Sequence, residues 1–291
     1  MLELDHVTIA YGETQAVEDF SLHMEPGEIV SLVGESGSGK TSVIRGILGL
    51  LPGGGAVTQG NIVFDGKDLL DVTPEQWRTV RGREISMIFQ DSGAMMNPTR
   101  KIGAVFAEYL RTHEKLTKKE AWKKGTQMLA RMRLPSPENI MCSYPFQLSG
   151  GMAQRVTIAL AACSRARLLI ADEPTTALDV TIQAQILKLM NELREKNGTA
   201  VLFITHDLGV INQMADNVAV MYCGQVVEYA PAGTIFHKNE YSHPYTEGLM
   251  LSIPRLDTPS DERLEAIPGA VPHPLDLPKG CKFAPRCKYA T

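Results

Sequence analysis

Residues 34–41 carry the side chains and spacing of a site that binds phosphate. They read Gly-Glu-Ser-Gly-Ser-Gly-Lys-Thr between an apolar run, residues 29–33, and a helix-like stretch, residues 42–51, which is the context that a phosphate loop requires. Glycines let backbone N–H groups turn toward a β-phosphate, Lys40 would contact β- and γ-oxygens, and the Thr41 hydroxyl would ligate Mg²⁺. The nucleotide would also contact Gly34, Glu35, Ser36, Gly37, Ser38, Gly39 and Ser42.

Two adjacent carboxylates, Asp172 and Glu173, follow the apolar run of residues 168–171. Asp172 ends this run, where we expect it to hold Mg²⁺ through water. Phosphoryl transfer to water depends on positioning and charge stabilisation, so orienting the attacking water is the role expected of Glu173. An isolated Asp-Glu pair is more often a surface charge, so these assignments depend on the phosphate loop upstream.

Gln90 and His206 follow two further apolar runs. The Gln90 amide would reach Mg²⁺ and the attacking water, and His206 would contact the γ-phosphate. Alone, a glutamine carries no signal and a strand-end histidine is usually a structural residue. Because ligands of open α/β sheets lie beyond the carboxyl ends of the strands, we expect both side chains to gather with the phosphate loop and the carboxylates.

A second glycine-containing anion site is expected at residues 149–151, Ser-Gly-Gly, before the helical pattern of residues 153–162. Ser149 would cap that helix while the glycine N–H groups face an anion. Simple helix capping explains the same spacing. Tyr11, which precedes Gly12, would stack on adenine, although a tyrosine there is more often a plain surface or core residue.

The elements that must position these residues indicate an α/β fold. Residues 29–33, 168–171 and 201–204 are continuously apolar, as in strands buried on both faces of a parallel sheet. Three alternating runs predict an antiparallel sheet: residues 2–7, 61–65 and 217–229, the last with a turn at Cys223-Gly224. Residues 102–134 are patterned as helices.

We therefore predict a P-loop NTPase (RecA-like) core with an antiparallel β subdomain, a helical insertion and an irregular extension. Residues 1–91 would form the first part of the core with the β subdomain, and residues 92–165 the helical subdomain that carries the Ser-Gly-Gly site. Residues 166–230 would complete the core. Residues 231–291, punctuated by prolines, would form the C-terminal extension.

Composition narrows the class of protein. At 291 residues and 44% hydrophobic content, the chain has room for one nucleotide-binding unit with appendages. Its 29 basic and 33 acidic residues give a net charge of −4 without a basic, aromatic stripe, so nucleic acid is not expected. No apolar run approaches a membrane span and the acidic start lacks a secretory n-region, which predicts a cytosolic, soluble chain. Five scattered cysteines indicate reduced thiols.

The motifs follow one another in an order that is similar to a known family. The order is the phosphate loop, Gln90, residues 148–151, the carboxylate pair, residues 177–179 and His206. Over essentially the whole chain this resembles the ABC-type ATPase subunits of membrane transporters. The resemblance implies a head-to-tail dimer in which ATP lies between one subunit's phosphate loop and the other's Ser149, Gly150, Gly151 and Met152, with Asp179 linking the sites.

Four stretches resemble a subgroup, the di- and oligopeptide permease ATPases, whose near relatives serve nickel permeases. They are residues 149–152, 174–185, 243–246 and 280–287. Met152 stands where the superfamily usually has Gln, a change that appears in a subgroup. Residues 92–98 depart from the Pro-rich start and Ser-Leu-Asn-Pro of the subgroup. Since this stretch normally meets the coupling helix of the membrane subunit, partner matching would differ there.

The resemblance implies an Mg²⁺-dependent ATPase on the cytoplasmic face of the plasma (inner) membrane that energises import of di- or oligopeptides. Implied partners are a second, different ATPase subunit, two transmembrane permease subunits and an extracellular or periplasmic substrate-binding protein. Nickel, a metal chelate or another small solute is an alternative cargo. Alternatives of another class are a soluble ABC ATPase acting on nucleic acid, ribosomes or Fe–S assembly, and a bare phosphate-loop kinase. The permease-like tail and the missing basic patch argue against the soluble ATPase.

Cys281 and Cys287 lie six positions apart in the Pro-rich tail, which is not the Cys-x-x-Cys pair of a structural zinc site. Some relatives continue this segment with further cysteines and bind a [4Fe-4S] cluster, which needs about four thiolates. We expect such a cluster only where further cysteines follow Thr291.

Overall fold

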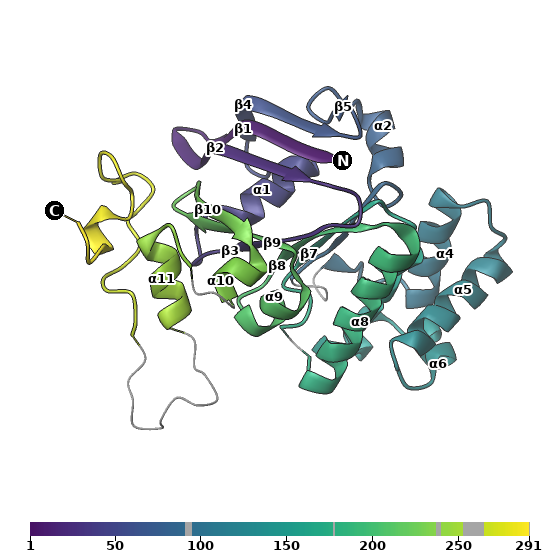
Figure 1. The fold of residues 1–291 in the computed structure, drawn as a ribbon. Coiled ribbons are helices and arrows are strands. Elements are labelled where there is room, and N and C mark those ends of the chain that lie inside the picture. Colours follow the sequence, from purple (N-terminus) through teal and green to yellow (C-terminus); the bar gives the residue numbers. More distant parts are fainter. Residues whose placement is uncertain (91–94, 177, 237–239, 253–264, 291) are drawn as a thin grey trace. The chain divides into compact units, whose positions relative to one another are not determined.

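The computed structural model describes residues 1–90, 95–176, 178–236, 240–252 and 265–290. The chain forms two compact units. The first unit consists of Met1–Glu25, Ile29–Asp71 and Ile204–Thr291, and the second of Pro26–Glu28 and Val72–Phe203. Figure 1 shows the elements of both units along the chain.

The first unit contains a four-stranded sheet of order β2-β1-β4-β5. β1 pairs antiparallel with both β2 and β4, so that Leu2 lies opposite Met24 on one side and Phe64 on the other. The predicted runs at residues 2–7 and 61–65 lie in β1 and β4. The strands are β1 (Leu2–Tyr11), β2 (Thr14–Met24), β4 (Gly55–Phe64) and β5 (Lys67–Asp68).

Strand β2 was not predicted, and a local irregularity explains why. Val17, Phe20, Leu22 and Met24 are its buried apolar side chains. The step from Val17 to Phe20 breaks the alternation, because Asp19 between them has a φ of 51° and the pairing with β1 shifts register there. A bulge of this kind hides the period-2 signal of a strand.

A second set of strands in the first unit holds β9 between β3 and β10. β3 (Ile29–Val33) runs parallel to β9 (Asn217–Tyr222), with Val33 opposite Val220, and β10 (Gln225–Pro231) runs antiparallel to β9. The prediction that the 217–229 hairpin joins the antiparallel sheet of residues 2–7 was therefore wrong. Five consecutive residues of β9 are buried, which is typical of a strand that is covered on both faces of its sheet.

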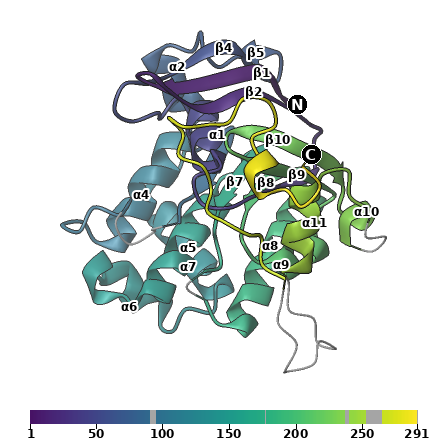
Figure 2. The ribbon, with the colours of Figure 1, turned by 90° about the vertical axis from the view of Figure 1, so that its left-hand side faces the viewer.

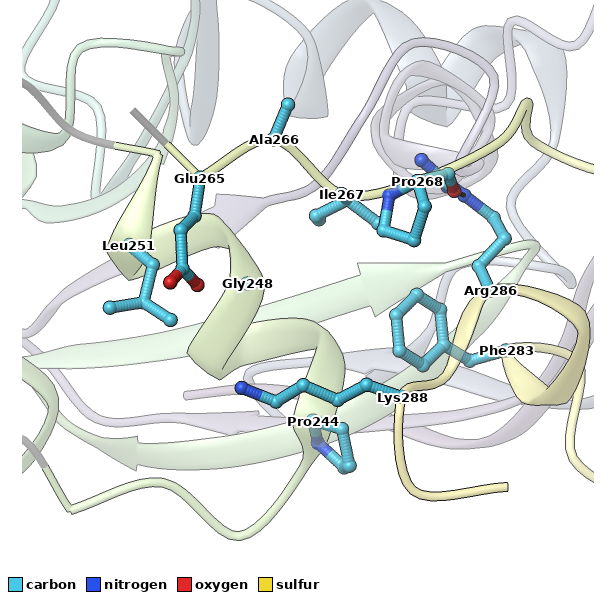
Figure 3. A pocket seen from close by; sticks show the side chains of 10 residues that line it. All are labelled: Pro244, Gly248, Leu251, Glu265, Ala266, Ile267, Pro268, Phe283, Arg286 and Lys288. Atoms are coloured by element: carbon cyan, nitrogen blue, oxygen red, sulfur yellow. Dashed lines mark hydrogen bonds between the residues drawn. The ribbon is translucent and has the colours of Figure 1, made fainter. Parts of the chain in front are cut away.

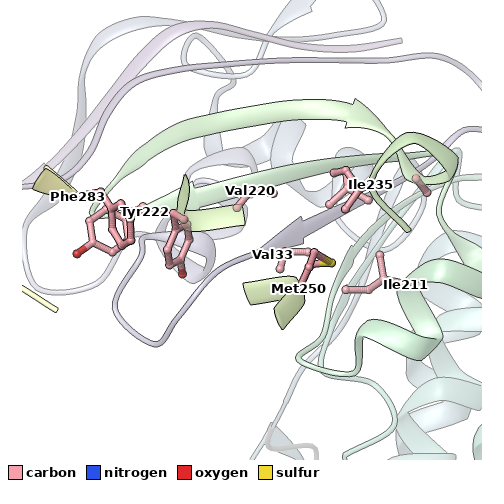
Figure 4. Close-up of a cluster of buried hydrophobic side chains, with 10 residues drawn as sticks. Val33, Ile211, Val220, Tyr222, Ile235, Met250 and Phe283 are labelled. Atoms are coloured by element: carbon pink, nitrogen blue, oxygen red, sulfur yellow. The ribbon is translucent and has the colours of Figure 1, made fainter. Parts of the chain in front are cut away.

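Short helices pack around β9 in the same unit. Their bounds are α9 (Leu208–Met214), α10 (Ala232–Phe236), α11 (Pro244–Leu251) and the 3₁₀ turn η2 (Ala284–Arg286). Figure 4 shows their apolar side chains meeting those of β3 and β9, with Val33, Tyr222 and Phe283 in one cluster. The strand that leads into the phosphate loop therefore shares a core with the C-terminal tail. Helix α1 (Lys40–Ile47) instead buries Val43 and Ile47 and contacts β1, β2 and β4.

The second unit contains the three strands of order β8-β7-β6. They are β6 (Ile85–Ile88), β7 (Leu168–Asp172) and β8 (Ala200–Ile204), of which residues 200–203 belong to this unit. β6 and β7 are parallel, with Ile85 opposite Leu168. Every residue of β7 and β8 is buried. The buried strands predicted from continuous apolar runs are confirmed as β3 in the first unit and β7 and β8 here. β3 and β7 each run parallel to a neighbouring strand, as predicted.

Helices make up most of the rest of the second unit. Thr117 caps α5 with a reciprocal bond to Glu120, and Thr73 caps α2 in the same way with Gln76. Helix α5 contacts α4, α6 and α7, and α4 also contacts α6 and α7 (Figure 2). The helices are α2 (Pro74–Val80), α4 (Ile102–His113), α5 (Lys118–Arg131), α6 (Pro137–Cys142), the 3₁₀ turn η1 (Pro145–Gln147), α7 (Gly150–Cys163) and α8 (Val180–Asn197).

The helical pattern over residues 102–134 is present as α4 and α5. The domain boundaries at residues 91, 165 and 230 stay predictions. Within the described ranges, no helix has both the length and the apolar character needed to cross a bilayer.

Candidate nucleotide-binding site

The phosphate loop in the first unit runs from the end of β3 to the start of α1. Lys40 is the first residue of α1 and is 8% exposed. Its Nζ donates to Gly34 O at 2.7 Å, to Glu35 O at 2.9 Å and to Ser38 Oγ at 3.1 Å. The predicted phosphate-binding lysine therefore bonds to residues at the start of the loop and to Ser38 near its end.

Two glycines allow the loop to lie against neighbouring backbone. A Cβ atom at Gly34 would come within 2.2 Å of Met221 O on β9. Gly39 has a φ of 102° at the N-terminus of α1, and a Cβ there would meet Ala16 O at 2.8 Å. Only glycine avoids both penalties. The N-cap residue Gly39 makes no side-chain capping bond to α1, so the N-terminus of this helix can present backbone N–H groups to an anion.

The other predicted residues of the first unit lie near strand or helix ends. Tyr11 ends β1 and its ring packs over Gly55, where a Cβ would come within 2.4 Å of the ring. The Tyr11 hydroxyl is 3.4 Å from Ser42 Oγ on α1. His206 is exposed between β8 and α9, next to Asp207, which caps α9. The adenine and γ-phosphate roles of Tyr11 and His206 stay predictions.

The carboxylate pair in the second unit is buried at the end of β7. Asp172 and Glu173 are each 6% exposed. Gln90 Nε2 donates to Glu173 Oε2 at 2.9 Å, so the structure brings together two side chains that the sequence had predicted to act together. Thr176 Oγ1 donates to Glu173 O at 3.1 Å. A carboxylate held by an amide donor is oriented to accept a proton from water.

Glu173 also has an unusual backbone conformation that its neighbours maintain. Its φ is 47°, in the left-handed region that costs a non-glycine residue about 1–2 kcal/mol. Gln154 on α7 donates from Nε2 to Glu173 O at 3.2 Å and to Pro174 O at 2.6 Å. Helix α7, which begins at the Ser-Gly-Gly motif, therefore holds the carboxylate end of β7 in place.

The predicted second anion site lies at the N-terminus of α7. Ser149 is the N-cap, and its Oγ accepts the Met152 N–H at 3.3 Å. Gly150 is exposed, and a Cβ there would meet no atom within 4 Å. Asp179 caps α8 through Ile182 N–H at 3.0 Å. Capping by Ser149 is confirmed, whereas anion binding and the linking role of Asp179 stay predictions.

The sequence did not indicate three residues that contact these sites. Tyr245 and Arg286 bind Glu35 in the phosphate loop, and Gln154 binds the Glu173 backbone. Residues 243–246 and 280–287 were noted as motifs, yet their partners lie more than two hundred positions away. Ser92, Gly93 and Ala94, in the stretch expected to meet a coupling helix, lie outside the described residues, as does Ala177.

The five cysteines are free thiols. Burial raises the pKa of Cys163 to about 12, which keeps that thiol protonated and unreactive. Cys281 is exposed, and Cys287 Sγ accepts the Tyr289 N–H at 3.4 Å. Over the part of the chain that the structure describes, three or more His, Cys, Asp or Glu side chains nowhere gather as metal ligands would.

A glycine-rich loop between a buried parallel strand and a helix, with a buried carboxylate pair after another parallel strand, defines a P-loop NTPase. Family models place the chain within this class. The model described as ABC transporter matches residues 17–176, and that described as oligopeptide/dipeptide transporter, C-terminal region, matches residues 227–291. A third model, an AAA domain described as putative AbiEii toxin of a type IV toxin–antitoxin system, matches residues 144–212.

Individual relatives agree with the first two models. The oligopeptide transport ATP-binding protein OppD of Bacillus subtilis is 46% identical over 100% of this chain and 82% of its own length. AppD of the same organism is 50% identical over 94% of this chain and 83% of its own. The dipeptide transport ATP-binding protein DppD of Lactococcus lactis is 45% identical over 96% of this chain and 79% of its own length. The chain belongs to the ABC transporter ATP-binding family and is an ATPase of that type.

Solved structures support the same assignment. The ATP-binding cassette MJ0796, in a dimeric post-hydrolysis state bound to ADP and Pi, matches with a TM-score of 0.73 and 28% identity. The match covers 80% of this chain and 99% of that cassette. A second dimeric structure of MJ0796 matches with a TM-score of 0.72 and 27% identity. The predicted fold class is therefore confirmed.

Proposed function

We propose that this chain hydrolyses ATP to energise the import of di- or oligopeptides through a membrane ABC permease. The observation that carries the proposal is the match of residues 227–291 to the oligopeptide/dipeptide transporter C-terminal region. Relatives that match nearly the whole chain bear the names of oligopeptide and dipeptide transport proteins. The cargo would pass through other subunits, so the sequence of this chain does not identify it. The transport experiment below therefore also tests nickel, a metal chelate or another small solute as the cargo.

The residue roles follow from the chemistry of each side chain. Lys40 and the loop N–H groups would bind the β- and γ-phosphates, and His206 would contact the γ-phosphate. Thr41, Gln90 and Asp172 offer oxygen ligands, which Mg²⁺ prefers, and Mg²⁺ would neutralise phosphate charge. Glu173 would accept a proton from the attacking water. Its burial and its bond from Gln90 support this role, because both restrict the direction in which the carboxylate can point.

We further propose that the chain acts in a complex at the cytoplasmic face of the plasma (inner) membrane. Its partners would be a second ATPase subunit of different sequence, two permease subunits and an extracellular or periplasmic binding protein. The exposed N-terminus of α7 supports pairing, because Ser149, Gly150, Gly151 and Met152 can face a nucleotide held by another subunit. The dimeric state named for the MJ0796 cassette supports it as well. A [4Fe-4S] cluster would require thiolates in addition to Cys281 and Cys287.

Transport by the reconstituted complex tests the proposal. The chain would be purified with its permease, inserted into liposomes with ATP inside and the binding protein outside, and supplied with labelled peptides of two to five residues or with ⁶³Ni²⁺. We expect ATP-dependent peptide uptake that is lost with Glu173→Gln. Uptake of nickel but not peptide would overturn the cargo, and co-purification with ribosomes or nucleic acid instead of a permease would overturn the transport function.

A further inference from the structure

The C-terminal tail, residues 265–290, contacts the phosphate loop through a partly buried ion pair. Arg286, in η2, donates from Nη1 to Glu35 Oε2 at 2.7 Å and from Nη2 to Glu35 Oε1 at 3.0 Å. The Arg286 side chain is 4% exposed and that of Glu35 is 31% exposed. This is a bidentate arginine–carboxylate pair, the geometry that combines the strongest attraction with a defined orientation.

Arg286 is itself anchored on several sides. Its Nε donates to Pro268 O at 2.9 Å, and its guanidinium lies 5.8 Å from the centre of the Tyr222 ring. Figure 3 shows Arg286 beside Pro268 at one end of a small pocket that Phe283 and Gly248 of α11 also line. The hydrogen bonds that Arg286 donates to the Glu35 carboxylate raise the pKa of Arg286 above its ordinary value, so the guanidinium stays charged. The position of Arg286 is therefore set by the tail and by β9.

Glu35 connects this anchor to the residues that would bind phosphate. Its carbonyl oxygen accepts Lys40 Nζ at 2.9 Å and the Ser38 N–H at 3.2 Å. Its own N–H donates to the Tyr245 hydroxyl on α11 at 2.8 Å. A shift of Glu35 would move an acceptor of Lys40 and a turn of the loop together. One residue thus links the tail, α11 and the loop lysine.

A second tail residue supports the other side of the loop. Lys282 Nζ lies 2.6 Å from Glu18 Oε2 and donates to Cys223 O at 2.8 Å. The next residue, Gly224, donates its N–H to Ser38 O at 3.0 Å. Phe283, which follows Lys282, packs against two aromatic rings, with its ring centre 5.2 Å from that of Tyr222 and 5.4 Å from that of Tyr245. The tail therefore contacts the loop directly at Glu35. It also contacts Ser38 indirectly, through the turn between β9 and β10.

We propose that Arg286 is a positioning residue for ATP binding, which holds the phosphate loop in its nucleotide-binding shape through Glu35. Arg286 acts through Glu35, whose carboxylate it binds and whose carbonyl oxygen accepts Lys40 Nζ. A loop that is held before the nucleotide arrives loses less conformational freedom on binding, which improves affinity. The tail thereby contributes to nucleotide affinity rather than to the chemical step.

The test is the Kd for MgATP of the full chain, measured by titration calorimetry. We expect Arg286→Ala to raise Kd by about tenfold or more, because the loop then loses its anchor and Glu35 loses its charge partner. Lys288→Ala is the matched control. Lys288 lies two positions away and pairs with Glu247 at 2.9 Å, but its side chain is 52% exposed, so we expect its Kd to stay at the wild-type value.

Glu35→Gln tests the same contact from the loop side and decides the matter if Arg286→Ala does not fold. We expect a raised Kd in this variant as well, and the double variant to bind no more weakly than the worse single variant. In steady-state hydrolysis, KM for ATP should rise while kcat stays near the wild-type value. A residue that only supports folding would lower the folded fraction and leave Kd of the folded protein unchanged. A wild-type Kd in either single variant, an equal rise with Lys288→Ala, or additive effects would each overturn the proposal.

Discussion

Two glutamates follow buried strands in this protein, one in each unit, and the surrounding structure holds them in different ways. Glu35, after β3, is bound by Tyr245 and Arg286, which lie 210 and 251 positions later in the chain. Glu173, after β7, is bound by Thr176 and Gln154, 3 and 19 positions away, and by Gln90, 83 positions away. The phosphate loop depends on the far end of the chain, whereas the carboxylate pair depends on nearer elements.

Because of this difference, we expect nucleotide affinity and kcat to depend on different contacts. Contacts to Glu35 act on the loop that would bind phosphate, so their loss should appear in nucleotide affinity. Contacts to Glu173 act on the carboxylate that would orient water, so their loss should appear in kcat. Substitutions of the residues that bind Glu35 or Glu173 would contradict this expectation if they changed nucleotide affinity and kcat equally.

Replacing Glu173 itself should have the largest effect. In Glu173→Gln the side chain keeps its size but loses the basic oxygen, so we expect hydrolysis to fall by about 10²- to 10⁴-fold. Kd for MgATP should stay at the wild-type value. Phosphate release and calorimetric binding measure the two quantities, and unchanged turnover would remove Glu173 from the water-orienting role.

Replacing Gln154 should reduce the rate without touching Glu173. Gln154→Ala removes two donors from the Glu173 and Pro174 carbonyls, and we expect kcat to fall by about 10- to 100-fold because the carboxylate is misplaced. Leaving these buried acceptors unsatisfied should also cost about 1–3 kcal/mol of unfolding free energy. Steady-state kinetics and thermal unfolding test both effects. Thr157, which bonds the Gln154 carbonyl at 2.8 Å, supplies the control Thr157→Val, and a rise in KM for ATP with unchanged kcat would contradict the comparison.

Replacing Tyr245 should affect affinity more mildly. Tyr245→Phe removes the hydroxyl that accepts the Glu35 N–H, a bond whose net contribution is about 1 kcal/mol, so we expect Kd to rise by about fivefold. The control is Tyr222→Phe. The Tyr222 hydroxyl accepts a hydrogen bond from Arg286 Nη1 at 3.4 Å, which is long and therefore weak. A larger effect for Tyr222→Phe than for Tyr245→Phe would show that the Glu35 N–H does not report on loop positioning.

The smallest expected effect is the pH dependence of the tail. His243 Nδ1 accepts the Tyr245 N–H at 3.1 Å and caps α11, which requires an imidazole unprotonated at Nδ1. Burial lowers the pKa of His243 below 6.5, against the raising effect of the Glu228 carboxylate. The stabilising contribution is therefore present above pH 6.5 and lost as the pH falls through the lower folded-state pKa. Thermal unfolding between about pH 7.5 and 5.5 should show a steeper loss in wild type than in His243→Asn, and parallel curves would contradict it.

Individual residues show which contacts and strands could be predicted from the sequence and which could not. Gln90 and Glu173 were expected to act together and lie within hydrogen-bond distance, because both follow apolar runs that end at one edge of a parallel sheet. Strand β2 escaped prediction since the bulge at Asp19 interrupts its alternation. The β9–β10 hairpin was assigned to the wrong sheet, because alternation identifies a strand but not its neighbour. Tyr245, Arg286 and Gln154 had no assigned role, since an isolated tyrosine, arginine or glutamine carries no local signal.

The sequence by itself determined the phosphate loop, the buried strands and the carboxylate pair. These features depend on local properties: glycine conformational freedom, the period of apolar side chains and the residue at a strand end. Only the tertiary structure decided what holds each glutamate. The bonds to Glu35 exist because β9, α11 and the tail return to β3 and share one apolar core with it. Such contacts join residues far apart along the chain, and their geometry depends on the path of everything between them.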